Sequence, residues 1–441
     1  MLPSTEDCTN ALDDDCDGIA CSACLWSRTA GDASHQTLTA SAVDDDQNIY
    51  VVGVFDGTID LGGAPLIASG LGDILVAKLD EHGDVLWARN YGSAQQEGAY
   101  GVSVTSSGIA IVGYFEKNLT IGAWSLAGAP GERTPFVASI SAAGEPHWAV
   151  TVDGVEDAYA FAVGPLPDDA LMVAGSLRTS KPAPLPQAIF VRRLAKDGAT
   201  EWTRIFESAY EQYATAAATD PVGNIFVAVQ GRDEIKLDAW TIPPPDGDDR
   251  LALAKLDAEG QVAWVQTVDG SYDGSVSDLF TTATGSVALA GSFIGTLVID
   301  DATLSSSDNR AAFVTMLTSG GIPIWTRSFG DATAFAAAVA VDPNDRVVVA
   351  GGFTGEMHMD TWSLASAGED DFFLASLEPT GEVRWAKRFG DKSFQIGGEL
   401  RLSVDKQGYI LSTGDFLGTV DFGAGPHTAQ GSDLYIAKHA P

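Results

Sequence analysis

A short segment near the start of the chain combines side chains that bind metal ions. In "EDCTNALDDDCDGIACSAC", Asp13, Asp15 and Asp17 alternate along the chain and are followed by Gly18. Alternating carboxylates before a turn glycine are typical of the first half of a calcium-binding loop. An EF-hand loop also needs a bidentate glutamate at its twelfth position, where this chain has Cys24. The pattern therefore predicts a calcium site of a different kind, or no metal site.

All four cysteines of the protein lie in the same segment: Cys8, Cys16, Cys21 and Cys24. Clustered cysteines beside a large cysteine-free region predict a disulfide-stapled appendage in an oxidising compartment. Three pairings are open. A stapled acidic linker without metal and a zinc site are the alternatives to calcium. The spacing lacks paired zinc knuckles, and the many hard oxygen donors favour calcium over zinc.

Tyrosines with neighbouring carboxylates recur at a second set of positions, in "YGSAQQEGAYG", "DGVEDAYAF", "ESAYEQYAT" and "DGSYDGSVS". The pairs are Glu97 with Tyr100, Asp157 with Tyr159, Glu211 with Tyr213, and Asp273 with Tyr272. Aromatic planes and carboxylates around one opening can bind sugars or cationic groups. The alternative interpretation is that each tyrosine packs between neighbouring units while the acid caps a turn.

Three tryptophans form a third candidate set. Trp124, Trp240 and Trp362 lie in the similar stretches "GAWSL", "DAWTI" and "DTWSL". Exposed, they would be stacking platforms for a ligand; we expect instead that each packs onto its own unit.

The elements that must position these residues repeat along the chain. Seven other tryptophans mark the repeat: Trp26, Trp87, Trp148, Trp202, Trp264, Trp325 and Trp385. Their spacings are 61, 61, 54, 62, 61 and 60 residues. A glycine after a β-branched run keeps the same period at Gly53, Gly113, Gly175, Gly291, Gly351 and Gly414, and Val229 replaces it in the fourth copy. Fixed-period similarity of this kind indicates a repeat architecture.

One copy, residues 334–390, shows the expected elements. "AFAAAVAV", "VVVAGGF", "DFFLASLE" and "VRWAKRFG" read as four strands, and the turns between them contain Asp-Pro or Gly. Evenly spaced groups of four short antiparallel strands are typical of propeller blades. We therefore predict an all-β fold, a seven-bladed β-propeller of four-stranded antiparallel blades over residues 25–441, preceded by an Asp/Cys-rich segment at 1–24.

The pattern "VAVDxxGxVxVAGxFxGxxD…DxFLAxLxxxGxVxW" resembles the bacterial SBBP-type propeller repeat of secreted and surface proteins. The resemblance covers about residues 25–441 and implies a location outside the cytoplasm, without a common activity. The N-terminal segment resembles the Asp/Cys-rich calcium motif of thrombospondin type-3 repeats. That resemblance implies Asp13, Asp15 and Asp17 as calcium ligands, with Asn10 as a further one.

Charge and hydropathy limit the partners. The formal net charge is −35; such an acidic surface repels phosphate backbones, which argues against nucleic acid and anionic lipid as partners. No apolar run is long enough to span a membrane. Residues 1–25 show no basic start followed by an apolar stretch, so no signal peptide is expected in this sequence. An extracellular or cell-surface location is the expectation.

The chain ends on a third strand, "SDLYIAKHAP", and its repeats begin on a Trp strand, "LWSRTAG". We expect Leu25–Ala30 to supply the missing fourth strand by pairing with Leu434–Lys438, which would close the ring and remove an open edge.

The sequence carries no common enzyme motif such as G-x-S-x-G, H-E-x-x-H or a P-loop. The leading prediction is a secreted or surface-displayed, non-catalytic binding module for a glycan or a protein, with calcium at its N-terminus. The alternatives are a structural subunit of a bacterial surface structure that assembles through the N-terminal segment, and a carbohydrate-active hydrolase or lyase at the channel mouth.

Overall fold

The computed structural model describes residues 24–441 except 130, 156, 179–186, 232–233, 244–249, 307–308, 331–332 and 394. The described chain is all-β with antiparallel sheets, and a short 3-10 turn, η1 (Pro167–Asp169), joins two of its strands. The Asp/Cys-rich segment at 1–23 lies outside the described residues.

Each repeat forms one group of four strands. In the first repeat these are β2 (Gln36–Val43), β3 (Ile49–Phe55), β6 (Asp73–Leu79) and β7 (Val85–Tyr91). In the second they are β8 (Glu97–Thr105), β9 (Gly108–Glu116), β12 (Arg133–Ser141) and β13 (Pro146–Thr151). In the third they are β14 (Ala158–Pro165), β15 (Leu171–Arg178), β16 (Gln187–Leu194) and β17 (Thr200–Phe206).

The remaining groups follow the same order. The fourth and fifth repeats contain β18 (Gln212–Thr219), β19 (Ile225–Gly231), β22 (Arg250–Leu256), β23 (Val262–Thr281), β24 (Val287–Ile299), β26 (Ala311–Leu317) and β27 (Pro323–Phe329). The sixth contains β28 (Ala334–Val341), β29 (Val347–Phe353), β32 (Asp371–Leu377) and β33 (Val383–Phe389). The seventh contains β34 (Ile396–Val404), β35 (Ile410–Phe416), β38 (Asp433–His439) and β1 (Cys24–Ala30).

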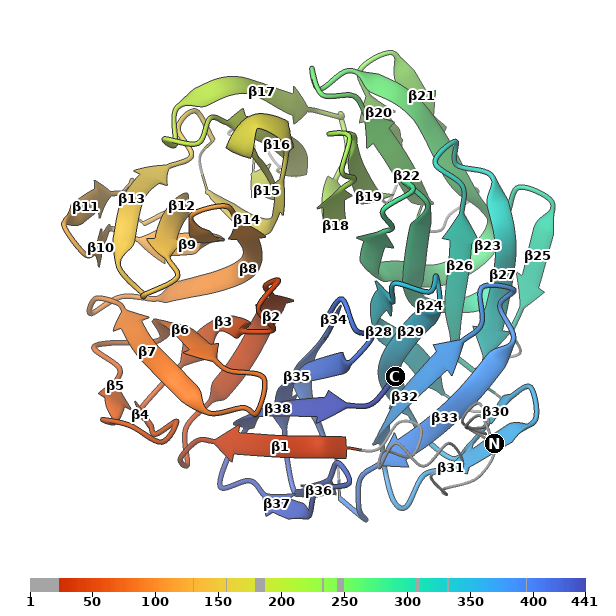
Figure 1. The fold of residues 1–441 in the computed structure, drawn as a ribbon. Coiled ribbons are helices and arrows are strands. Elements are labelled where there is room, and N and C mark those ends of the chain that lie inside the picture. The colour runs from red at the N-terminus through yellow and green to blue at the C-terminus, as the bar shows by residue number, and fades with distance from the viewer. Residues whose placement is uncertain are drawn as a thin grey trace, which may run out of the picture.

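Short strands fill the excursion between the second and third strand of most repeats. They are β4 (Thr58–Ile59), β5 (Leu66–Ile67), β10 (Asn118–Ile121), β11 (Trp124–Ala127), β20 (Ile235–Leu237), β21 (Trp240–Ile242), β25 (Ala302–Ser305), β30 (Glu356–Met359), β31 (Trp362–Ala365), β36 (Thr419–Asp421) and β37 (Pro426–Thr428). Figure 1 shows the sheets side by side around a common centre, with β2, β14, β18 and β34 near it and β7, β13, β17 and β33 on the outside.

Several of the many aspartates stabilise tight turns. In the turn between β28 and β29, the carboxylate of Asp342 accepts the backbone N–H groups of Asn344 and Arg346, each at 2.8 Å. Asp44, Asp80, Asp220, Asp257 and Asp405 bind turn N–H groups in the same way. A side chain that bonds to the backbone two and four residues ahead favours a turn over a continued strand. Many aspartates therefore have a local structural role.

The repeat-marking tryptophans join neighbouring repeats. In six of them the indole N–H donates to a backbone carbonyl in the third-to-fourth strand turn of the next repeat, at 2.9–3.3 Å. Trp87, for example, donates to the carbonyl of Ala142 at 3.0 Å and covers Gly144, where a Cβ would lie 2.9 Å from the ring. The turn glycine, with a φ of +85° at Gly144, thus serves both the turn and the tryptophan.

The two ends of the described chain meet in one sheet. β1 pairs antiparallel with β38, with Trp26 opposite Lys438 and Ala30 opposite Leu434. The predicted pairing of Leu25–Ala30 with Leu434–Lys438 is confirmed, and Figure 1 shows β1 as the outermost strand beside β38.

The fourth and fifth repeats differ from the expectation of separate four-stranded sheets. β23 is continuous, pairing with β22 through Val262–Val268 and with β24 through Val268–Thr281, so that one eight-stranded sheet results. The reason is local, because β24 extends to Ile299 and its extension pairs with the segment that would otherwise be a loop. Gly270 permits this, since a Cβ there would lie 2.1 Å from the carbonyl oxygen of Thr296.

Helices of the length and hydropathy needed to cross a membrane do not occur in the described part of the chain.

Candidate functional site

The innermost strand of each repeat carries an irregularity at a similar place. In six repeats the register slips by one residue, which leaves one residue of that strand without a partner opposite it. These residues are Thr39, Tyr100, Phe161, Thr215, Ser277 and Ala337. In β34 the irregularity lies between Ile396 and Leu400. Bulges of this kind redirect side chains and are frequent beside binding sites.

The repeated glycine of the second strand faces this irregularity. A Cβ on Gly113 would lie 1.9 Å from the carbonyl oxygen of Gly98, and one on Gly351 would lie 1.9 Å from that of Phe335. The glycines at the other four copies are equally close to a carbonyl of the first strand. The sequence period is thus explained by a close backbone approach that leaves no room for a side chain.

The innermost strands enclose a central cavity of about 410 Å³. Residues of β2, β8, β14, β18, β23, β28 and β34 all line it, so every repeat contributes. Small residues predominate in its lining, where hydroxyl side chains such as Thr39, Ser277 and Ser403 stand beside apolar ones, and Tyr100 and Phe161 add aromatic surface. The volume lies in the range of small-molecule sites.

Two charged residues interrupt the repeat inside this cavity. The residue that pairs with the position before the repeated glycine is Ala40, Gly101, Ala162, Ala216 or Ala338 in five repeats. In the fifth and seventh repeats the same position holds Asp278 and Arg401, and both line the cavity. An acid and a base therefore stand where the repeat otherwise has the smallest residues.

Asp278 is held by backbone donors. Its Oδ1 accepts the N–H of Leu279 at 2.9 Å, and its Oδ2 accepts the N–H of Val339, from the next repeat, at 3.0 Å. Burial raises the pKa of the Asp278 carboxyl to about 6, although the charge of Arg401 and the two backbone hydrogen bonds oppose that rise. Desolvation disfavours the charged form and so dominates here. A carboxyl with such a pKa can exchange a proton near neutral pH.

Arg401 is fixed from three sides. Its Nε donates to the carbonyl of Thr39 at 3.0 Å and its Nη1 to that of Leu400 at 3.0 Å, while its Nη2 pairs with Oε2 of Glu399 at 2.7 Å. Because Thr39 belongs to the first repeat, the guanidinium also bridges two repeats across the start and end of the described chain.

Two further polar groups border the cavity. Tyr100 stacks on Tyr114 with ring centroids 5.8 Å apart, and burial raises the pKa of its phenol. Thr215 lines the cavity, and its hydroxyl has no hydrogen-bond partner among the described residues. A buried hydroxyl without a partner costs free energy that a bound ligand or water would recover.

The predicted tyrosine–acid pairs do not share one surface. Tyr100 lines the central cavity, whereas Glu97 is fully buried and accepts the backbone N–H of Ser93 at 3.0 Å. Burial raises the pKa of Glu97. This pair is therefore split between the cavity and the interior.

The other pairs occupy separate places. Asp157 pairs with Arg178 at 3.5 Å, and Tyr159 packs against Phe161. Asp273 pairs with Arg310 at 3.5 Å and has a largely exposed side chain.

The pair Glu211–Tyr213 and the single residue Tyr272 remain. Glu211 and Tyr213 are half-buried at the start of β18. Tyr272 lies in β23, and its side chain is outside the described part. Ligand binding by these eight residues stays a prediction.

The three excursion tryptophans differ among themselves. Trp124 and Trp362 pack against hydrophobic clusters of the core, as expected. Trp240 is 41% exposed, so the packing expectation is wrong for it.

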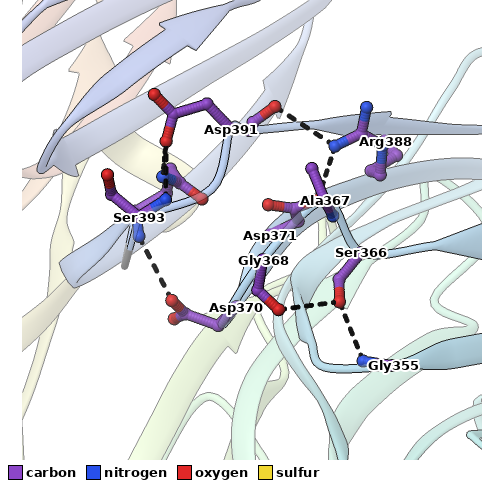
Figure 2. Close-up of polar contacts among 11 residues, drawn as sticks. Gly355, Ser366, Ala367, Gly368, Asp370, Asp371, Arg388, Asp391 and Ser393 are labelled. Atoms are coloured by element: carbon purple, nitrogen blue, oxygen red, sulfur yellow. Dashed lines mark hydrogen bonds and ion pairs between the residues drawn. The ribbon is translucent and has the colours of Figure 1, made fainter.

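A second polar cluster lies where the sixth repeat meets the seventh (Figure 2). Asp371 is fully buried and accepts Nη1 of Arg388 at 2.6 Å and the N–H of Ala367 at 2.7 Å, while Asp370 accepts the N–H of Gln395 at 3.1 Å. The bond from Gln395 to Asp370 ties the loops of successive repeats together, and the two bonds of Asp371 lie within the sixth repeat. The cluster has a structural explanation, and its charge is partly neutralised by Arg388.

The predicted calcium ligands Asn10, Asp13, Asp15 and Asp17, and the cysteines Cys8, Cys16 and Cys21, lie outside the described residues. Cys24 opens β1, and its Sγ donates to the carbonyl of Trp26 at 3.3 Å. Burial raises the pKa of its thiol to about 11. The disulfide pairing and calcium binding stay predictions.

No family model matches this chain. No curated protein matches it. Several solved structures are similar to it at low identity. A protein of unknown function from Dyadobacter fermentans is 9% identical, with coverage of 94% of this chain and 99% of that one and a TM-score of 0.42. A Synechocystis apocarotenoid oxygenase variant is 9% identical, with 94% and 93% coverage and a TM-score of 0.44. A puromycin hydrolase is 13% identical, with 87% and 59% coverage and a TM-score of 0.39.

These similarities correct one prediction. The sequence pointed to a non-catalytic module for a glycan or a protein; that prediction is contradicted, because enzymes are among the similar solved structures and a non-catalytic role is not shown. At these TM-scores none of them assigns an activity to this chain.

Proposed function

We propose that the protein binds a small molecule in its central cavity and that Asp278 can exchange a proton with it. The observation that carries this proposal is the break in the repeat, where Asp278 and Arg401 replace the alanine or glycine of the other five repeats. The other five repeats have alanine or glycine at this position, so the fold does not require a charge there, and desolvated charges are costly unless they are used or compensated.

The experiment restores the repeat. In the full-length protein, Asp278→Ala combined with Arg401→Ala gives every repeat a small residue at this position. We expect this variant to fold, as judged by circular dichroism, because five repeats already tolerate alanine or glycine there. Small-molecule libraries are then screened by thermal shift against wild type, the double variant and Asp301→Ala, a change at an exposed position. Ligands that stabilise wild type and Asp301→Ala but not the double variant support the proposal. Equal stabilisation of all three proteins by every ligand found would contradict it.

The seven repeats are, in this proposal, the blades of one closed propeller of the SBBP type. The four-stranded groups, the pairing of β1 with β38 and the contribution of every repeat to one cavity support this interpretation. An experimental structure would test it directly, and a sheet arrangement in which β1 leaves β38 unpaired would contradict it.

The N-terminal segment has a separate proposed role outside the cytoplasm. Its carboxylates and cysteines favour calcium binding within a disulfide-linked segment. Calorimetric titration of the full chain with Ca²⁺ is expected to give a signal that is lost in an Asp13→Asn, Asp15→Asn, Asp17→Asn variant. Four reactive thiols in the natively isolated protein would contradict the disulfide part.

A further inference from the structure

We infer that the central cavity selects a small organic cation, such as a protonated amine, that pairs with Asp278. This inference rests on the proposed function and adds the chemical class of the ligand.

The two charged residues of the cavity differ in how well their charges are compensated. Arg401 already has a carboxylate partner, because its Nη2 lies 2.7 Å from Oε2 of Glu399, and its other contacts are the carbonyls of Thr39 and Leu400. Among the described residues, hydrogen bonds to the carboxylate of Asp278 come from the backbone N–H groups of Leu279 and Val339. Asp278 therefore carries the negative charge of this cavity that is least compensated by an ion pair. A ligand of opposite charge would complete it.

Aromatic residues form part of the lining of the central cavity. Tyr100 and Phe161 lie in the lining with Asp278 and present aromatic surface. Aromatic faces attract ammonium and guanidinium groups, and the attraction is strongest where water is excluded. Aromatic surface beside one carboxylate forms a site suited to an organic cation.

The cavity suits an organic cation better than a metal ion. Calcium takes six to eight oxygen ligands and magnesium requires near-octahedral oxygen geometry. Among the described residues that line the cavity, Asp278 is the only carboxylate, and the other polar side chains there carry hydroxyls or, in Arg401, a guanidinium. One carboxylate is far short of the oxygen ligands that calcium requires, and side chains such as Phe161 and Leu279 suit a ligand that brings its own apolar surface. The net charge of −35 also raises the local concentration of cations at the protein.

Proton linkage gives the inference a distinct signature. The charged neighbours of the site are Arg401, whose field reaches Asp278, and Glu399, which also acts on Tyr100. Since a bound cation favours the ionised carboxylate, binding below the pKa of Asp278, about 6, must release a proton. The affinity should therefore fall by about tenfold for each pH step below that value, while a neutral ligand would show no such loss.

The experiment uses matched probes with the full-length protein. Benzylamine, benzyl alcohol and benzoate form one set, and ethanolamine, ethylene glycol and glycolate form another; each probe is titrated calorimetrically at pH 7.5. We expect the amines to bind at least tenfold more tightly than their neutral and anionic counterparts. We also expect the amine affinity to fall between pH 6 and pH 5.

Two test variants and one control variant locate the binding. Asp278→Asn should abolish the preference for amines, and Asp301→Asn, at an exposed position, should retain it. Glu399→Gln leaves Asp278 in place but frees the charge of Arg401, so it should weaken amine binding by several-fold, which keeps the test decisive if Asp278→Asn fails to fold.

The outcomes separate the two proposals. Neutral or anionic probes that bind more tightly than the amines, and lose binding in the Asp278→Ala, Arg401→Ala variant, would overturn the cation inference and leave the cavity function standing. Amine binding that survives Asp278→Asn unchanged would also overturn the inference, because the amines would then bind elsewhere. Absence of binding by every amine, at any pH tested, would overturn it as well.

Discussion

Replacing a repeated glycine by alanine should damage the contact between the first two strands of a repeat. In the sixth repeat, a Cβ on Gly351 would lie 1.9 Å from the carbonyl oxygen of Phe335 and 2.8 Å from the ring of Phe373. Carbon and oxygen atoms in ordinary contact are roughly 3.4 Å apart or more, so the strands would have to separate by more than about 1 Å. Overpacking of this kind costs about 1–3 kcal/mol, and each ladder hydrogen bond that is strained adds up to about 1 kcal/mol.

We therefore expect Gly351→Ala to lower the free energy of unfolding by about 3 kcal/mol, measured by urea denaturation with tryptophan fluorescence. Gly63→Ala is the matched control, because no heavy atom would lie within 4 Å of its new Cβ. The control should unfold within about 0.5 kcal/mol of wild type. Identical urea midpoints for the two variants would refute the reasoning. The fourth repeat does not require glycine, since Val229 occupies this position and is buried. The requirement for glycine therefore depends on where the facing carbonyl lies in each repeat.

Two further predictions concern titration and the tryptophan contacts. Because the folded pKa of Asp278 is raised to about 6 from an ordinary value of 3.8, its contribution to stability is complete below the ordinary value and is lost as pH rises through 6. Relative to Asp278→Asn, wild type should lose at most about 3 kcal/mol between pH 4 and pH 7, measured by urea unfolding at both pH values; a constant difference would contradict the assignment. Trp325→Phe removes a hydrogen bond of 2.9 Å to the carbonyl of Pro379 and should cost about 1 kcal/mol more than Trp240→Phe, whose ring is 41% exposed; equal thermal denaturation midpoints would count against the contact.

The repeat period made much of the fold predictable. A tryptophan every 54–62 residues and a β-branched run before each glycine indicate the four strands, because such patterns reflect local propensity and burial. The pairing of β1 with β38 also followed, since a third strand without a fourth and a fourth without a third are complementary. The continuous strand β23 did not follow, because its pairing depends on how far β24 extends beyond the usual turn.

The cavity was missed for a different reason. A bulge shifts the strand by one residue, and the residue that faces the centre depends on that shift. Asp278 and Arg401 are 123 residues apart, and only the pairing of each innermost strand with its neighbour reveals that they occupy equivalent positions. A usable signal did exist: aligning the repeats on their glycines would have shown two charged residues in a column of alanine and glycine.

The series of tryptophan contacts between repeats is interrupted beside the closing strand β1. Trp385 is 1% exposed, and its indole N–H has no partner among the described residues. In the other repeats this N–H meets a turn between the third and fourth strands of the next repeat, but in the seventh repeat those strands, β38 and β1, come from opposite ends of the described chain. The junction must therefore rely on β1 itself.

Removing residues 1–30 should lower the free energy of unfolding by several kcal/mol, because β1 contributes its ladder with β38 and the 3.0 Å hydrogen bond from Trp26 to the carbonyl of Glu81. The new edge on β38 should also promote aggregation. Removing residues 1–23 alone is the matched control, so that the difference between the two truncations measures the contribution of β1. If both truncated proteins melt at the same temperature and stay equally monodisperse by light scattering, β1 and β38 do not stabilise each other, and the repeats must be held together by their remaining contacts.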